Sequence, residues 1–118
     1  MKFSKYRAIK SKDFTTGKVF HSKKEHKRAL DLRILEKKGD ISDLQEQRKF
    51  QLLETFKDSQ GVTERGITYC ADFVYFDRKK GMAVVEDVKS PITKEDSTYI
   101  IKRKLFKVRY PEFIFLET

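Results

Sequence analysis

The feature that most constrains the fold is a pair of short apolar runs joined by a tight polar turn. The runs cover residues 69–76 (YCADFVYF) and 82–89 (MAVVEDVK), and the five residues between them read DRKKG. Both runs are rich in β-branched and aromatic residues, and a short polar loop ending in glycine is typical of a hairpin connection. The pattern therefore predicts an antiparallel β-hairpin at the centre of the molecule.

The hairpin carries charged side chains inside its apolar strands. Asp72 stands in the first strand, and Asp87 and Lys89 stand near the end of the second. Because side chains alternate along a strand, Asp87 and Lys89 should share one face while Glu86 points to the other. Antiparallel pairing should bring Asp72 beside Asp87 or Lys89. The sequence therefore predicts a small cluster of two carboxylates and one lysine at one end of the hairpin.

Two interpretations of this cluster are open. A charge in an apolar strand is costly unless it is paired or binds a metal, so a cross-strand ion pair between an aspartate and Lys89 would explain the residues without catalysis. Alternatively, the two carboxylates would suit Mg²⁺, which takes oxygen ligands and keeps several waters. Lys89 could then orient or deprotonate a water, or stabilise charge developing on a phosphate.

The remaining elements can be placed around the hairpin. Ser22 and Glu25 form a capping-box pattern before apolar residues at helical spacing, which predicts a helix that ends at Gly39. A second helix is expected from about residues 93–96 to Pro111, where proline stops it. The other expected elements are a short strand or extended segment over 41–47, a strand over 49–56, a loop over 57–66 and a last strand over 112–116. This order predicts an α/β or α+β fold, a central mixed sheet flanked by two helices.

Composition restricts the class of protein. A chain of 118 residues with 38% apolar and 38% charged residues predicts one compact domain with a densely charged surface. No apolar run approaches the roughly 20 residues of a membrane span, so we expect no membrane insertion. The single Cys70 excludes an internal disulfide and a cysteine zinc site, and it is expected in the core of a cytoplasmic protein.

The positive charge is concentrated at the N-terminus. The net charge is +9, and residues 1–28 hold ten Lys/Arg against two acidic residues. We interpret residues 1–21 as a basic arm that follows a phosphate backbone, and residues 22–118 as a single domain, although a solvated tail would have the same composition. The candidate nucleic-acid contacts are Lys5, Arg7, Lys10, Lys23, Lys24, Lys102 and Lys104. For the last two, a solvated helix face is an equal alternative.

These residues resemble a known family pattern. Asp72, followed after the turn by Asp87-Val88-Lys89, is similar to the motif of PD-(D/E)XK nucleases, the restriction-endonuclease-like superfamily that includes archaeal Holliday-junction resolvases. Ala71 stands where the superfamily usually has proline. The chain resembles most closely small phage- and prophage-encoded members, in stretches that include FHSKKEHKRALDLRILEKKGDISDLQEQRKF, YCADFVYFD, VVEDVKS and KRKLFKVRYP.

The resemblance implies a fold and an activity. The fold would be the restriction-endonuclease-like αβββαβ core. The activity would be that of a Mg²⁺-dependent endonuclease acting on DNA, with Mn²⁺ able to substitute. Branched DNA in phage recombination or packaging is one substrate that the resemblance would allow. Asp72 and Asp87 would bind the metal and Lys89 would be catalytic. If the protein is phage- or prophage-encoded, it would act in the cytoplasm of a bacterial host, and it could act as a homodimer.

Some assignments stay open at this stage. Glu25 could serve only the helix cap, or, as the resemblance implies, turn inward and join Asp72 and Asp87 at the metal. Glu86 could replace Asp87 as a ligand if a bulge exchanged the two acids, although only Asp87 has the acidic-x-Lys spacing with Lys89. A DNA-binding protein that does not cleave and an RNA-binding module are the alternatives to a nuclease. The second lacks the usual aromatic motif on its strands.

Overall fold

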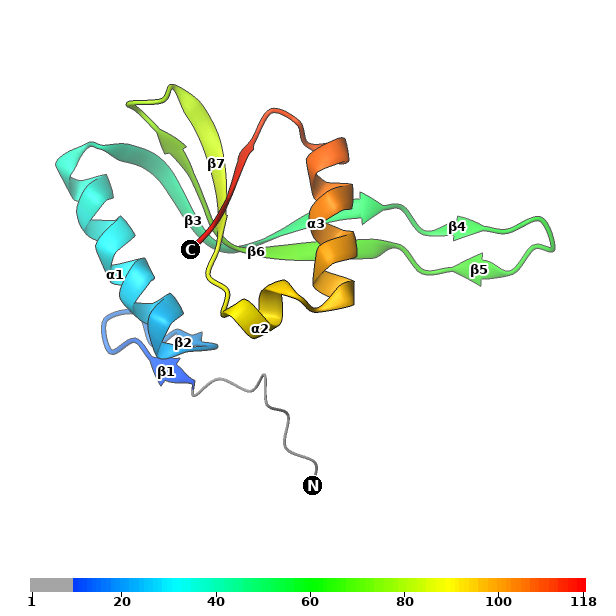
Figure 1. Cartoon of the computed structure of the whole chain (residues 1–118), viewed down its shortest axis with the longest axis horizontal. Helices are drawn as coiled ribbons and strands as arrows, with labels where there is room; N and C mark the ends of the chain where they lie inside the picture. Colours follow the sequence, from blue (N-terminus) through cyan, green and yellow to red (C-terminus); the bar gives the residue numbers. More distant parts are fainter. Residues whose placement is uncertain (1–9) are drawn as a thin grey trace.

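The computed structural model describes residues 10–118, so Lys5 and Arg7 lie outside the described residues. The centre is a mixed four-stranded sheet in the order β3-β6-β7-β8 (Figure 1). The strands are β3 (Ile41–Leu53), β6 (Ile67–Asp77), β7 (Met82–Asp87) and β8 (Ile114–Glu117). Neighbours are antiparallel except β7 and β8, which are parallel. The helices are α1 (Lys23–Lys38), α2 (Pro91–Lys94) and α3 (Ser97–Arg109), with α2 and α3 in the crossover from β7 to β8.

The predicted hairpin is confirmed as β6 and β7. Its register runs from Asp77 opposite Met82 to Phe73 opposite Glu86. The N–H of Gly81 donates to the carbonyl of Asp77 at 2.8 Å, and Gly81 has a φ of 65°, a conformation that favours glycine. The hairpin strands are the two middle strands of the sheet, so each pairs with a neighbouring strand along both of its edges.

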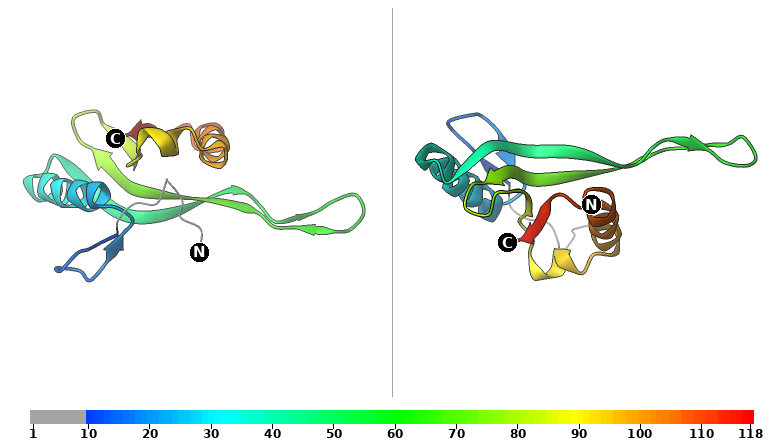
Figure 2. Two further views of the ribbon diagram at one scale, coloured as in Figure 1. Left: turned by 60° about the horizontal axis from the view of Figure 1, so that its bottom comes forward. Right: turned by 90° about the horizontal axis from the view of Figure 1, so that it is seen from above.

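Helices cover the two faces of the sheet from opposite sides (Figure 2). One apolar cluster joins α1 to the sheet and contains Phe20, Ala29, Leu32, Ile41, Phe73, Tyr75 and Val84. The other joins α3 to the opposite face and contains Phe50, Leu52, Tyr69, Ala71, Val74, Val85, Tyr99 and Phe106. Val84 and Val85 therefore lie on opposite faces, as the alternation in β7 predicts. The α/β arrangement with a mixed sheet is confirmed.

The helix ends follow their capping signals. The hydroxyl oxygen of Ser22 accepts a hydrogen bond from the N–H of Glu25 at 3.0 Å, and Gly39, with a φ of 86°, closes α1. The predicted single helix before the last strand is two helices. Asp96 leaves the helical conformation and its carboxylate accepts from the N–H of Tyr99, so it begins α3 as a new N-cap.

Two segments differ from the sequence-based expectation. Residues 41–53 form one long strand, β3, rather than two, and the β-bulges in it coincide with register shifts against β6. Residues 57–66 were expected as a loop. Instead β4 (Phe56–Lys57) and β5 (Thr63–Glu64) pair and extend the β3–β6 hairpin into a ribbon that projects from the body (Figures 1 and 2).

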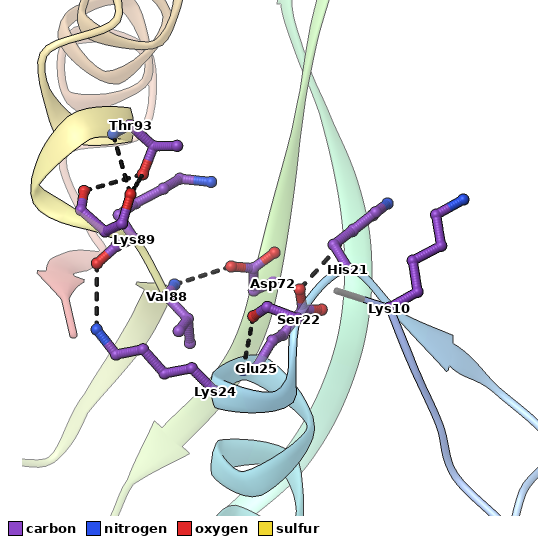
Figure 3. A pocket seen from close by; sticks show the side chains of 10 residues that line it. Lys10, His21, Ser22, Lys24, Glu25, Asp72, Val88, Lys89 and Thr93 are labelled. Atoms are coloured by element: carbon purple, nitrogen blue, oxygen red, sulfur yellow. Dashed lines mark hydrogen bonds and ion pairs between the residues drawn. The ribbon is translucent and has the colours of Figure 1, made fainter. Parts of the chain in front are cut away.

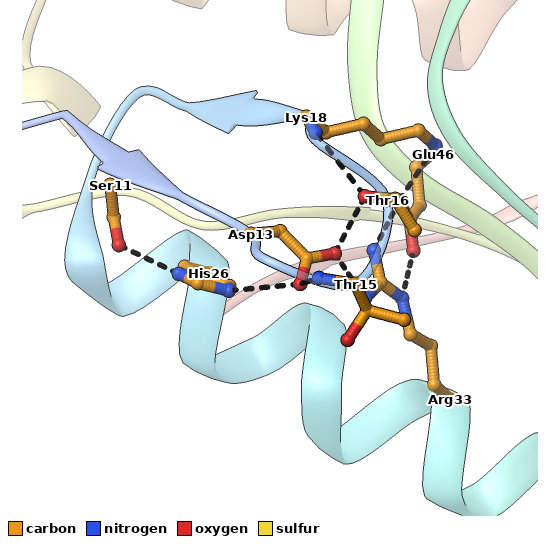
Figure 4. A network of polar contacts seen from close by, with 8 residues as sticks. All are labelled: Ser11, Asp13, Thr15, Thr16, Lys18, His26, Arg33 and Glu46. Atoms are coloured by element: carbon orange, nitrogen blue, oxygen red, sulfur yellow. Dashed lines mark hydrogen bonds and ion pairs between the residues drawn. The ribbon is translucent and has the colours of Figure 1, made fainter.

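The described part of the basic N-terminal segment is folded. β1 (Ser11–Lys12) and β2 (Val19–Phe20) form a small hairpin against α1. Figure 4 shows the polar contacts that hold it: Arg33 of α1 donates to Asp13 at 2.5 Å and to Glu46 of β3 at 2.9 Å. These contacts hold the pKa of Asp13 well below its usual range, because Thr16 and Arg33 donate to its carboxylate. The hairpin is thus part of the packed domain from residue 11 onward.

Cys70 is exposed on β6, so its expected place in the core is wrong. In the part of the chain that the structure describes, no helix is long and apolar enough to cross a membrane.

Candidate functional site

A pocket of about 470 Å³ lies between the start of α1, the end of β7 and the start of α2. Figure 3 shows its walls. The lining residues that matter for chemistry are Lys10, His21, Lys24, Glu25, Asp72 and Lys89. Two carboxylates and three lysines from distant parts of the chain therefore meet in one cavity.

Asp72 lies at the centre of the pocket. One of its carboxylate oxygens accepts a hydrogen bond from the N–H of Val88 at 2.8 Å, just past the end of β7. Burial, together with the nearby charges of Asp87 and Glu25, raises the pKa of Asp72 to about 7, against the opposing effects of Lys89 and of the hydrogen bond from Val88. A cation in this pocket would relieve that cost.

The alternation of side chains along β6 breaks at Asp72. Ala71 and Val74 both belong to the cluster on the α3 side, whereas Phe73 belongs to the cluster on the α1 side, so strict alternation breaks at Asp72. On the neighbouring strand, Gln47 has a φ of 58° and lies between the pairs that flank Asp72. A non-glycine residue in this conformation within a strand is uncommon and is often found near functional sites.

Asp87 is close to Asp72 but does not line the pocket. It is fully buried, and its carboxylate accepts hydrogen bonds from the hydroxyl of Tyr69 and, at 3.2 Å, from the main-chain N–H of Asp72. The Tyr69 pKa is raised well above its usual range by burial and by the charge of Asp87. Asp87 is thus a buried anchor behind Asp72.

Glu25 turns into the pocket. Its carboxylate is buried, and among the described residues its Oε2 has no hydrogen-bond partner, while its Oε1 lies 3.7 Å from Nδ1 of His21. Ser22 caps the helix through the main-chain N–H of Glu25, which leaves the Glu25 side chain available. Glu25 therefore combines the two roles that the sequence left open: a place in the helix cap and a carboxylate in the pocket.

Lys89 lines the pocket without forming an ion pair with Asp72 within the described structure. Its Nζ lies over the ring of Tyr99, 5.1 Å from the centroid. Its main chain is held on both sides, since its N–H donates to the Thr118 carbonyl at 3.0 Å and its carbonyl accepts from Nζ of Lys24 at 3.2 Å. The main chain of Lys89 is thus fixed. Its ammonium group forms no hydrogen bond or ion pair among the described residues.

Glu86 has a structural role on the opposite face. Arg28 donates two hydrogen bonds to it, at 2.5 and 3.0 Å, and the Tyr75 hydroxyl donates a third at 2.7 Å. The Thr118 hydroxyl adds a fourth at 3.1 Å. Because its oxygens are occupied away from the pocket, Glu86 does not replace Asp87 or Asp72 at this site.

The pocket residues fit a metal held mainly by two carboxylates. No group of three or more His, Cys, Asp or Glu side chains in residues 10–118 converges closely enough to hold an ion by itself. Glu25, whose Oε2 is buried and has no partner in the described part of the chain, and Asp72 nevertheless present oxygen ligands to the same cavity. Mg²⁺ is commonly bound by one or two carboxylates, several waters and a substrate phosphate, so this donor set suits it.

The predicted basic contacts divide into two groups. Lys10 and Lys24 line the pocket, and Lys23 is exposed beside Lys24 at the start of α1. Lys102 and Lys104 lie on α3 and do not line the pocket. Their contact with nucleic acid stays a prediction.

Two tyrosines that sequence reasoning missed support the site. The hydroxyl of Tyr69 donates a hydrogen bond to Asp87, and the ring of Tyr99 makes a cation–π contact with the ammonium group of Lys89. Tyr69 is three residues before Asp72 on the same strand, but only the sheet shows that it reaches Asp87 on the next strand. Tyr99 comes from α3, so no local pattern could link it to Lys89.

These features define a mixed-sheet α/β protein with a pocket that holds two carboxylates and three lysines. The family model described as protein of unknown function (DUF1064) matches residues 3–116, and the chain belongs to this family. No curated protein matches the chain. No solved structure matches it either.

Proposed function

We propose that the protein is a Mg²⁺-dependent endonuclease that hydrolyses DNA phosphodiester bonds. The observation that carries the proposal is the buried Oε2 of Glu25, which has no hydrogen-bond partner among residues 10–118 and lies in the same pocket as Asp72 and three lysines. Burial and the neighbouring carboxylates raise the pKa of Asp72 to about 7. Such a pocket is costly in a purely structural role and useful for binding a cation and a phosphate.

The arrangement of elements supports a restriction-endonuclease-like fold. The order of α1, β3, β6, β7, α3 and β8 agrees with the αβββαβ core that the motif resemblance implies. The β1–β2 hairpin, α2 and the β4–β5 ribbon are additions to that core. The acidic-x-Lys segment lies at the end of β7, one of the two middle strands, where Val88 and Lys89 line the pocket.

In this proposal each residue has a separate task. Asp72 and Glu25 hold the metal, and Asp87, held by Tyr69, keeps the main chain of Asp72 in place and adds negative charge behind it. Bound Mg²⁺, or Mn²⁺ in its place, supplies positive charge to a phosphate oxygen and lowers the pKa of a bound water. Lys89 orients the attacking water or stabilises the charge that develops on the phosphate.

The charges of the pocket wall favour a polyanionic substrate. Lys10, Lys24 and Lys89 surround the two carboxylates, and the basic N-terminal segment continues from Lys10. Lysines at such positions lower the cost of bringing phosphates beside carboxylates. A branched DNA in phage recombination or packaging, within a bacterial host cell, is the substrate context we propose.

A DNA-binding protein without cleavage is the second candidate. It is favoured by one observation: Asp87 is fully buried, so only two carboxylates line the pocket in the described structure. In that case Asp72 and Asp87 would have a structural role only, and the lysines would bind DNA that the protein does not cleave.

Cleavage of linear, nicked, forked and four-way DNA separates the candidates. The wild type should cut at least one form with Mg²⁺ or Mn²⁺ and none with EDTA. Asp72→Asn and Lys89→Ala should bind DNA and fail to cut. Asp31→Asn, at an exposed carboxylate of α1, is the matched control and should cut like the wild type. A wild type that binds every form but never cuts would reject the enzyme.

A further inference from the structure

The ribbon that carries β4 and β5 exposes apolar side chains far from the core. Phe56 is 46% exposed and Val62 is 51% exposed. The ribbon lengthens the molecule to 54 Å along its long axis, and the radius of gyration is 16.3 Å. A compact chain of this length would have a radius of gyration of about 13 Å. Isolated two-stranded ribbons are marginally stable in water. A partner that covered the exposed apolar side chains of this ribbon would therefore stabilise it.

The ribbon's charge does not suit nucleic acid. Between residues 54 and 65 it carries three acidic side chains and two basic ones, in a chain whose net charge is +9. The acidic residues are Glu54, Asp58 and Glu64. With a net charge of −1, this segment offers a phosphate backbone little attraction, whereas its three carboxylates can pair with a basic protein surface.

Helix α3 offers such a surface. Its outer face carries exposed Ile101, Leu105 and Val108 at helical spacing, with Ile101 at 57% and Val108 at 81% exposure. The helix contains five Lys or Arg residues and no Asp or Glu. The apolar stripe and the positive charge of α3 thus complement the apolar side chains and negative charge of the ribbon.

A ribbon cannot cover the stripe of its own chain. Within one chain the helix and the ribbon meet only near the ribbon base, where Arg109 lies 3.8 Å from Glu54. Beyond that point the ribbon runs away from α3 in both views (Figures 1 and 2). In a two-fold dimer, the ribbon of each copy could cover the apolar stripe on α3 of the other copy, because each copy contributes one ribbon and one helix.

We infer that the protein forms a two-fold dimer in which the β4–β5 ribbon of each copy packs on the outer face of α3 of the other. The apolar residues Phe56 and Val62 meet the stripe of Ile101, Leu105 and Val108, and the acidic ribbon residues meet the lysines and arginines of α3. This inference does not depend on cleavage, and it assigns the charge of α3 to a protein contact rather than to DNA.

Sedimentation equilibrium of the full chain tests the dimer. The ribbon variant is Phe56→Ser with Val62→Ser, and the helix variant is Ile101→Ser with Val108→Ser. Each should weaken association at least tenfold. Phe14→Ser, at a side chain that is 94% exposed on the β1–β2 hairpin, removes a comparable apolar surface elsewhere and should leave association unchanged. Circular dichroism should show that all variants stay folded, and Val108→Ser alone is the milder substitute if the double helix variant does not.

Mixing the two variants tests the pairing itself. A heterodimer of the ribbon variant and the helix variant keeps one intact ribbon facing one intact helix. The mixture should therefore associate more tightly than either variant alone. If the helix variant dimerises like the wild type, the ribbons pair with each other and the inference fails.

Two further outcomes would also overturn the inference. One is a wild type that stays monomeric at about 100 µM, since this would place any dissociation constant well above the micromolar range. The other is a ribbon variant that keeps its oligomeric state but loses DNA binding, since this would make the ribbon a nucleic-acid contact.

Discussion

The main-chain N–H of Asp72 donates to the carboxylate of Asp87 at 3.2 Å, while the carboxylate of Asp72 itself points into the pocket. The two acids of the hairpin are thus unequal: one holds the strand in place and the other faces the cavity. Their closeness raises the pKa of Asp72, together with burial and Glu25.

The metal-free protein should lose stability as the pH rises from about 4 to about 7. The pKa of Asp72 is raised from 3.8 to about 7 in the fold, so the unfolded chain releases this proton first. The free energy of unfolding falls within this window by a few kcal/mol at most, since one pKa unit corresponds to about 1.4 kcal/mol. Below pH 4 both states hold the proton, and above 7 both have released it.

Thermal melts with EDTA between pH 4 and pH 8 measure this loss. Asp72→Asn should remove the extra slope, so the difference between the two proteins reports Asp72 alone. Added Mg²⁺ should raise the melting temperature of the wild type more at pH 8 than at pH 5. An identical slope in wild type and Asp72→Asn would contradict the expectation.

Glu25→Gln should stabilise the metal-free protein and weaken Mg²⁺ binding. The charge of Glu25 is one cause of the raised pKa of Asp72, so neutralising Glu25 removes a repulsion between two carboxylates in one pocket, on the order of 1 kcal/mol. Ser22→Ala is the contrasting change, because it removes the helix cap at a cost of about 1 kcal/mol without touching the carboxylate. Urea titrations and Mg²⁺ calorimetry measure both; a Glu25→Gln protein that binds Mg²⁺ like the wild type would remove Glu25 from the site.

Tyr69→Phe should reduce cleavage without removing any pocket-lining group. The change deletes the hydroxyl that donates to Asp87, and the loss of such a supporting contact commonly lowers metal affinity or activity about 10–100-fold. The variant should also be less stable by about 1–3 kcal/mol, because a buried carboxylate loses its donor. Mg²⁺ affinity is the decisive measurement, since a purely structural role for Tyr69 would lower stability and leave that affinity unchanged.

Arg28→Leu should strongly destabilise the fold. It leaves the fully buried carboxylate of Glu86 without its two-bond partner, and breaking a buried pair in this way costs about 3–5 kcal/mol. The double change Arg28→Leu with Glu86→Leu should recover much of that loss. Arg109→Leu, which breaks the exposed pair with Glu54, should change stability by less than about 1 kcal/mol in the same denaturation assay.

Much of the fold could be predicted because its signals are local. The hairpin turn, the Ser22 cap and Gly39 act within a few residues, so β6, β7 and α1 were predicted within two residues of their ends. The β4–β5 ribbon and the break at Asp96 were missed. A polar segment such as KDSQGVTERG looks like a loop when it is read alone, and only pairing with its own return strand makes it a ribbon.

Alternation in the strands predicted that Glu86 and Asp87 face opposite sides, and the structure confirms it. Which acid faces the pocket could not be predicted, because this depends on groups distant in sequence. Arg28 of α1 donates hydrogen bonds to the Glu86 carboxylate, and the hydroxyl of Tyr69 on β6 donates one to the Asp87 carboxylate. The break in alternation at Asp72 likewise could not be predicted, and it lies opposite Gln47 of β3, which has a φ of 58°.

The sequence by itself determined the types of residue at the site, the hairpin that carries three of them and the basic character of the chain. Hydrophobic periodicity and turn-forming residues act over a few neighbouring positions, so they can be recognised in the sequence alone. Only the tertiary structure decided that Glu25 turns inward, that Asp72 and not Asp87 lines the cavity, and that Lys89 rests on Tyr99. Those outcomes depend on burial and on hydrogen-bond partners separated by many residues, and these exist only after the sheet and its helices have packed.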